Sequence, residues 1–134
     1  LFYFMLKSQK EMTIFYKGID YFNDNQYKKA HKEWEILWKH IGHVPRRQCM
    51  KVFLQLTGIY QNIGLKKLDA VRYGIRVATQ RLEENNTSIN QWVDVDSIES
   101  FLMKYENKNI PLKAFDELVL KRKWGRVHKD LGPE

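Results

Sequence analysis

Apolar side chains recur at steps of three and four residues along most of this chain, and this spacing constrains the fold more strongly than any other feature. The stripes cover residues 12–22, 27–41, 50–60 and 68–82. Such steps place apolar side chains on one face of an α-helix, and no window alternates as a half-buried strand would. With 134 residues, the chain is long enough for one domain with a real core. The sequence therefore predicts an all-α fold, a compact bundle of four to five helices.

Capping and turn residues set the expected boundaries. Ser8 and Glu11 form an S-x-x-E capping box, which should begin the first helix. Residues 23–25 should end it, with Asn25 in a left-handed turn. Three more helices are expected over about residues 26–40, 46–63 and 65–84. Because the connections between them are short, we expect two antiparallel helical hairpins.

The last part of the chain is less regular. Residues 87–95 are expected to form a connection, after which Asp96 and Glu99 provide a second capping box for a short fifth helix. One or two further turns are expected within residues 114–120, and no apolar face continues beyond them. We therefore divide the chain into a helical domain, residues 8–106, and a basic C-terminal extension, residues 107–134.

Positive charge is concentrated in this extension. The chain has 23 Lys and Arg against 16 Asp and Glu, a formal net charge of +7, and residues 107–134 hold seven of these bases and four of the acids. The candidate partner-binding residues are Lys121, Arg122, Lys123, Trp124, Arg126 and Lys129. An indole among cations suits an acidic protein surface, and it equally suits phosphates with a base stacked on the ring. The third explanation is that these charged side chains are simply exposed to solvent and bind nothing. We expect an arm that docks on a partner instead of folding back over the domain.

His31 and Glu35 are neighbours on one face of the second predicted helix, beside its apolar stripe. They would form half of a site, with the imidazole as base or metal ligand and the carboxylate as its orienter. Gln55 or Arg47 from the facing helix would complete that site. The competing explanation, which we favour, is a polar pair in the core whose hydrogen bonds fix how the helices pack.

Other reactive groups give weaker signals. His40 and His43 are expected in solvent, which leaves the pair without the third ligand that a metal site needs. The single cysteine, Cys49, excludes a disulfide framework and a cysteine-rich zinc module. Neighbouring cations would lower its thiol pKa, but we favour a small buried hydrophobe. No glycine-rich phosphate loop, G-x-S-x-G or H-E-x-x-H motif occurs. We therefore predict no catalytic residue, no metal and no cofactor.

No apolar run is long enough to span a bilayer, since the longest near the start covers only residues 1–6. This predicts an intracellular protein without a membrane span. Because the sequence lacks an initiator Met, we also expect it to begin inside a longer product.

The second predicted helix carries a family resemblance. Its motif A-H-x-x-W-E-x-x-W consists of Ala30, His31, Trp34, Glu35 and Trp38. Together with Phe22-Asn23, Tyr27, Arg47, residues 53–55 and 69–70, and Val93-Asp94-Val95-Asp96, the motif resembles the domain-of-unknown-function family numbered 309. The resemblance covers about residues 12–106.

The resemblance implies a compact helical domain of four to five helices, found in bacteria and plastids, with no established activity. It therefore implies the bacterial cytoplasm or an organelle interior such as the plastid stroma. This chain has Lys29 and Lys32 where the family usually has Glu. If the family holds a catalytic or metal site, this member has lost much of it.

We favour a non-enzymatic helical protein-interaction module, a small subunit or accessory factor of a larger assembly. It would contact its protein partner through the basic C-terminal arm. One alternative is a small enzyme or metal-binding protein centred on His31 and Glu35. The other is a nucleic-acid-associated protein that binds phosphates through the tail.

Overall fold

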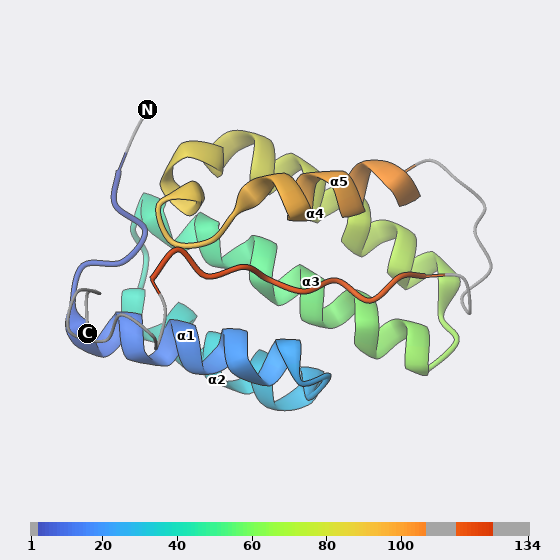
Figure 1. The fold of residues 1–134 in the computed structure, drawn as a ribbon, viewed down its shortest axis with the longest axis horizontal. Coiled ribbons are helices and arrows are strands. Elements are labelled where there is room, and N and C mark those ends of the chain that lie inside the picture. The colour runs from blue at the N-terminus through green and yellow to red at the C-terminus, as the bar shows by residue number, and fades with distance from the viewer. Residues whose placement is uncertain (1–2, 107–114, 125–134) are drawn as a thin grey trace.

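The computed structural model describes residues 3–106 and 115–124. Within these ranges the chain forms five α-helices and one 3-10 turn, without a strand. They are α1 (Gln9–Asn23), α2 (Tyr27–Ile41), η1 (Pro45–Arg47), α3 (Gln48–Gly64), α4 (Leu68–Asn90) and α5 (Val95–Tyr105). The helices pack around one apolar core (Figure 1). The prediction of an all-α bundle is confirmed.

Local sequence explains where the first two helices begin and end. The Ser8 hydroxyl accepts a hydrogen bond from the Glu11 amide at 3.1 Å, as the predicted cap requires. The Glu11 carboxylate, however, accepts the amide of Lys7 at 2.9 Å and does not return to Ser8. Asn25 has a φ of 60°, the left-handed conformation that Asn tolerates, and so turns the chain into α2.

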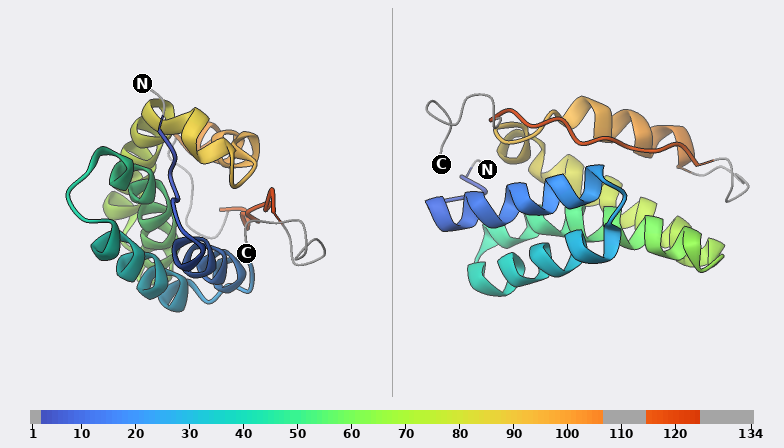
Figure 2. Two further views of the ribbon diagram at one scale, coloured as in Figure 1. Left: turned by 90° about the vertical axis from the view of Figure 1, so that its left-hand side faces the viewer. Right: turned by 60° about the horizontal axis from the view of Figure 1, so that its bottom comes forward.

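The core is rich in aromatic rings. Each helix contacts the next one along the chain, and α5 lies on the side of the bundle away from α2 (Figure 2). Phe15, Phe22, Trp34 and Phe53 are completely buried, and Phe15 meets Phe53 edge to face with their ring centroids 4.9 Å apart. The Trp34 indole Nε1 donates to the carbonyl of Phe15 at 3.0 Å, so its buried polar atom has a partner.

Two boundaries after the third helix differ from the sequence prediction. The predicted connection over residues 87–95 is wrong at its start, because α4 continues to Asn90. Asn85 does interrupt α4, with φ −125° and ψ 15°, but its buried side chain donates to the Arg81 carbonyl and accepts from the Tyr3 hydroxyl. The predicted Asp96 cap is also wrong, since Asp94 caps α5 by accepting the Asp96 amide at 3.1 Å.

Residues 115–124 form an extended segment and none of the helical turns expected there. The segment crosses α3 between α1 and α5 (Figure 1). Leu118 and Leu120 are buried in the same core as the helices. We expected an arm that docks on a partner instead of folding back over the domain. Over residues 115–124, the chain instead packs on the helical bundle. We call residues 115–124 the strap.

Candidate functional site

Side chains of three helices hold the backbone of the strap. Leu120 donates its amide to Asn23 Oδ1 at 2.8 Å, and its carbonyl accepts Asn23 Nδ2 at 2.9 Å. The Tyr60 hydroxyl on α3 accepts the Leu118 amide at 2.7 Å and donates to the Asp116 carbonyl at 2.5 Å. The Tyr105 hydroxyl on α5 accepts the Asp116 amide at 2.8 Å. These bonds replace the neighbouring strand that an extended chain normally pairs with.

Backbone pairing fixes the end of the strap. The turn between α4 and α5 forms an isolated antiparallel bridge in which Val93 lies opposite Arg122. The Asp94 amide donates to the Lys121 carbonyl at 2.9 Å, and the Lys123 amide donates to the Trp92 carbonyl at 3.0 Å. The strap is thus held from Asp116 to Lys123.

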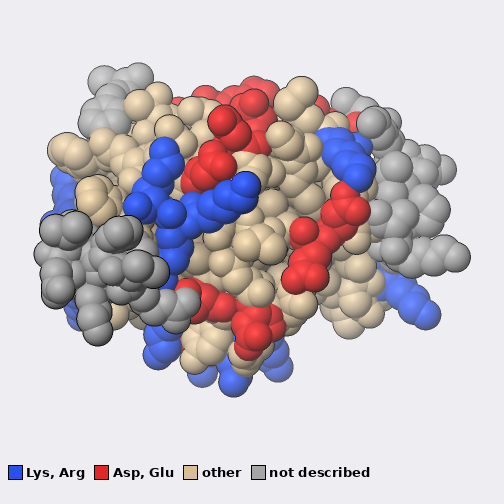
Figure 3. Space-filling view, in the orientation of Figure 1, with Lys and Arg blue, Asp and Glu red and all other residues tan. Residues whose placement is uncertain are grey.

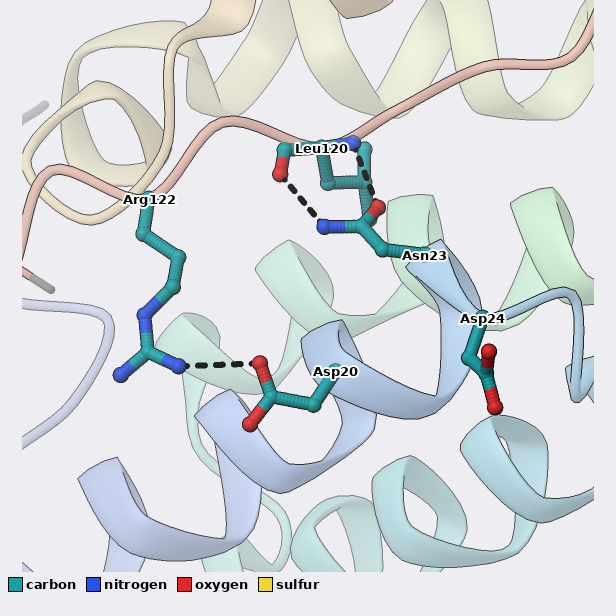
Figure 4. A pocket seen from close by; sticks show the side chains of 5 residues that line it. All are labelled: Asp20, Asn23, Asp24, Leu120 and Arg122. Carbon is teal, nitrogen blue, oxygen red and sulfur yellow. Dashed lines mark hydrogen bonds and ion pairs between the residues drawn. The ribbon is translucent and has the colours of Figure 1, made fainter. Parts of the chain in front are cut away.

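Arg122, one of the predicted partner-binding residues, is used inside the molecule. Its guanidinium lies 3.0 Å from Asp20 Oδ1 on α1 (Figure 4) and 4.2 Å from the centroid of the Tyr16 ring. Only 14% of the Arg122 side chain is exposed. A shallow pocket of about 360 Å³ lies here, lined by Asp20, Asn23, Asp24, Leu120 and Arg122. Arg122 is therefore an anchor of the strap.

The side chains next to Arg122 in the sequence, Lys121 and Lys123, face away from the bundle. Lys121 and Lys123 are exposed and form no ion pair within the described ranges. Trp124 is 39% exposed, and the centroid of its ring lies 6.5 Å from that of the Trp92 ring. Figure 3 shows a group of basic side chains at the left of this face with acidic side chains close by, and further basic side chains at its right and lower edges. Arg126 and Lys129 lie outside the described residues.

The structure brings His31 and Glu35 together but leaves both partly exposed. His31 Nε2 lies 3.9 Å from Glu35 Oε2, and the two side chains are 34% and 49% exposed. The partner of His31 Nδ1 is the buried Thr57 hydroxyl, at 2.7 Å. Because that hydroxyl donates to the Leu54 carbonyl at 2.8 Å, it accepts from the imidazole, which places a proton on Nδ1. The hydrogen bond between His31 and Thr57 therefore links α2 to α3.

The other two residues of the predicted polar set do not reach His31. Gln55 Oε1 lies beside α4, 3.4 Å from where a Cβ of Gly74 would be. The Arg47 guanidinium stacks on Trp38, 3.8 Å from the ring centroid. Among the residues that the structure covers, no group of three His, Cys, Asp or Glu is placed to hold a metal ion. His31, Glu35, Arg47 and Gln55 thus contribute to contacts between helices and do not come together as one site.

A buried ion pair that the sequence analysis missed joins α1 to η1. The Arg46 guanidinium binds both carboxylate oxygens of Glu11, at 2.6 and 2.8 Å, and donates to the Met5 carbonyl at 2.9 Å. His40 Nε2 lies 3.6 Å from Glu11 Oε2, and 42% of the His40 side chain is exposed, as the sequence predicts. Burial alone raises the pKa of Glu11, but hydrogen bonds from Arg46 and Lys7 lower it below its usual value. The S-x-x-E motif predicts a role for Glu11 in capping α1, but a local motif cannot predict an ion pair with Arg46, 35 positions away.

Cys49 lies completely buried at the start of α3. Burial raises the pKa of its thiol to about 12, which outweighs the opposing effect of the Tyr3 hydroxyl and of the Arg46 charge. At neutral pH the side chain is a thiol and packs as a small apolar group. The structure gives no support to a reactive cysteine.

No protein-family model, curated protein or solved structure matches this chain. Along the described part of the chain, no helix has the length and apolar character needed to cross a bilayer.

Proposed function

We propose that this protein is a non-enzymatic helical interaction module, a small subunit or accessory factor of a larger assembly. Two antiparallel helical hairpins would form its platform, and the basic C-terminal extension would bind an acidic surface of a protein partner. Lys29 and Lys32 stand where the family that the chain resembles usually has Glu, and this loss of acidic side chains supports a binding role over catalysis.

One observation carries the proposal: Lys121 and Lys123, which form no ion pair within the described ranges, project from a backbone that the bundle already holds. Lys121 and Lys123 alternate with the anchored Arg122, so they share the outward side of the strap. A surface ordered before binding loses less conformational entropy on association than a flexible arm would. Trp124, beside them, is of a residue type enriched at binding hot spots. Carboxylates of a partner would pair with the two ammonium groups.

The enzyme or metal-binding alternative has less support. It needs a third group beside His31 and Glu35, and the side chain that occupies this position is the Thr57 hydroxyl. Nucleic acid binding through the tail remains the other alternative, because phosphates would attract the same lysines. The experiment below separates an acidic protein from a nucleic acid.

The proposal is tested by reversing the two outward charges. The variant Lys121→Glu/Lys123→Glu and the control Lys28→Glu/Lys32→Glu change the net charge equally, and the control sites are exposed lysines on α2. Each tagged full-length protein would be used to recover its assembly from the native source, with and without nuclease. We expect wild type and control to retain the same proteins after nuclease treatment, and the strap variant to lose them although its melting temperature is unchanged.

Two results would contradict this proposal. Retention of the same proteins by the strap variant would place the contact elsewhere on the bundle. Loss of all partners on nuclease treatment would favour the nucleic acid alternative.

A further inference from the structure

Two cations share one aromatic ring at the junction of α2, η1 and α3. The Arg47 carbon Cζ lies 3.8 Å from the centroid of the Trp38 ring, and the Lys51 ammonium lies 4.7 Å from it. Arg47 is the last residue of η1, and Lys51 follows it by four residues, one turn along α3. The indole thus holds both positive groups in place by cation–π attraction.

These cations keep most of their hydrogen-bond donors. Arg47 Nε donates to the Trp38 carbonyl at 3.1 Å, and one Nη1 hydrogen is directed to His43 Nδ1 at 3.2 Å. In the described ranges neither Arg47 nor Lys51 pairs with a carboxylate, and Nη2 of Arg47 and Nζ of Lys51 have no hydrogen-bond acceptor. The end of the guanidinium that carries Nη1 and Nη2 is the edge that binds oxyanions in a fork.

The sequence that follows Glu35 is rich in bases and contains no acid until Asp69. From Ile36 to Leu68 there is no Asp or Glu, whereas six Lys and Arg occur there: Lys39, Arg46, Arg47, Lys51, Lys66 and Lys67. Arg46 is neutralised by Glu11. The nearest carboxylate in the sequence, Glu35, lies one turn before Trp38 on α2 and faces His31. Lys39 lies near the end of α2 and Lys51 near the start of α3, beside Arg47 of η1, whereas Lys66 and Lys67 follow the far end of α3. The bases near the Trp38 ring are therefore those at the junction of α2, η1 and α3.

We infer that the cluster of Trp38, Arg47 and Lys51, where α2, η1 and α3 meet, is a second binding site, one that takes the phosphodiester backbone of a nucleic acid strand. Fixed guanidinium and ammonium groups with free donors match phosphate oxygens. A uniformly negative polymer suits two cations that pair with no carboxylate in the described ranges better than a protein surface of mixed charge does. The inference does not depend on the proposed function, because it uses α2 and α3 and none of the strap residues.

The test is the binding of a fluorescent oligothymidylate of about 20 nucleotides, long enough to cover one such surface, measured by anisotropy between about 50 and about 200 mM salt. Five proteins are compared: wild type, Arg47→Gln/Lys51→Gln, Lys51→Gln, the control Lys28→Gln/Lys32→Gln, and the strap variant Lys121→Glu/Lys123→Glu. Lys51→Gln removes a side chain that makes no hydrogen bond within the described ranges, so it tests the site even if Arg47→Gln disturbs α2. Poly-glutamate of similar length competes in a parallel titration.

We expect the double variant at Arg47 and Lys51 to bind at least about tenfold more weakly at the lowest salt concentration. Each lost phosphate contact should reduce the slope of log K against log salt by about 0.7, hence about 1.4 for the double variant and about 0.7 for Lys51→Gln. The control should bind like wild type. The inference is overturned if wild type does not bind, if the control loses as much affinity, or if poly-glutamate competes as well as unlabelled oligothymidylate. Loss of binding only in Lys121→Glu/Lys123→Glu would assign the phosphates to the strap.

Discussion

The side-chain amide of Asn23 satisfies both backbone polar groups of Leu120, 97 positions further along the chain. Its Nδ2 donates to the Leu120 carbonyl at 2.9 Å and its Oδ1 accepts the Leu120 amide at 2.8 Å. One amide side chain at the end of α1 thus replaces the two hydrogen bonds that a neighbouring strand would make. This contact keeps the strap on the bundle while its alternate side chains face outward.

Replacing Asn23 by Ala removes both hydrogen bonds and leaves the polar groups of Leu120 without partners. We expect a loss of about 1–3 kcal/mol in the free energy of unfolding, measured by urea denaturation. The control Asn62→Ala changes a half-buried Asn at the end of α3, and it should stay within about 0.5 kcal/mol of wild type. Equal stability of the two variants would show that the amide does not hold the strap.

Two glycines in helices should respond oppositely to Ala. A Cβ on Gly18 would overlap Nε1 of the completely buried Trp34, so the indole must move and its hydrogen bond to the Phe15 carbonyl is disturbed. We expect Gly18→Ala to destabilise by about 1–3 kcal/mol. A Cβ on Gly58 meets nothing within 4 Å, and Ala favours the helix by up to about 1 kcal/mol. Thermal unfolding of both variants checks this pair, and a stabilised Gly18→Ala would refute the packing described for Trp34.

Glu11 should make stability depend on acid pH. Since its pKa in the folded state lies below its usual value of 4.5, its contribution is fully present above that value and is lost as the pH falls through the folded-state pKa. Glu11→Gln leaves the Arg46 guanidinium, which is 12% exposed, without its carboxylate. We therefore expect a loss in the free energy of unfolding near the lower limit for a buried pair, about 3 kcal/mol at pH 7.

Urea denaturation over a series of pH values checks this prediction. The difference between wild type and Glu11→Gln should shrink as the pH drops below 4.5. The control Glu83→Gln, at an exposed position on α4, should track wild type at every pH. A constant difference over the acid range would contradict the low pKa assigned to Glu11.

Cys49 should resist thiol reagents in the folded protein. Its burial and its thiol pKa of about 12 leave almost no thiolate at neutral pH. Ellman's reagent should label it only in denaturant, with one equivalent released on unfolding. Rapid labelling of the native protein would show that the start of α3 opens readily.

Much of the fold can be predicted from the chain because its helices are encoded locally. The apolar stripes, the Ser8 cap and the left-handed Asn25 place α1, α2 and α3 correctly. The end of α4 could not be predicted, because Asn85 is held by Tyr3, 82 positions away. The alternation of Leu118, Leu120 and Arg122 has the period of a strand, but it is too short to distinguish from a helical turn without its partners.

The candidate site was predictable only in part, for a geometric reason. Spacing alone places Glu35 one turn from His31, and the structure agrees. Gln55 and Thr57, however, are two residues apart on α3, about 200° around the helix axis, so they face different neighbours. Thr57 belongs to the apolar face that packs on α2, which is why the imidazole meets its hydroxyl and not the Gln55 amide. The strap anchors come from three helices, and no local pattern connects them.

Amide hydrogen exchange of the full-length protein, followed residue by residue by NMR, tests most directly whether the bundle holds the strap as a platform for its outward lysines. We predict alternating protection. The amides of Asp116, Leu118, Leu120 and Lys123 donate to acceptors on the bundle and should exchange at least about a hundredfold more slowly than in an unfolded chain. The amides of Val119 and Lys121, which have no acceptor within the described ranges, should exchange quickly. Uniformly fast exchange from residue 115 to residue 124 would contradict the account, because it would mean a free arm and no preformed binding surface.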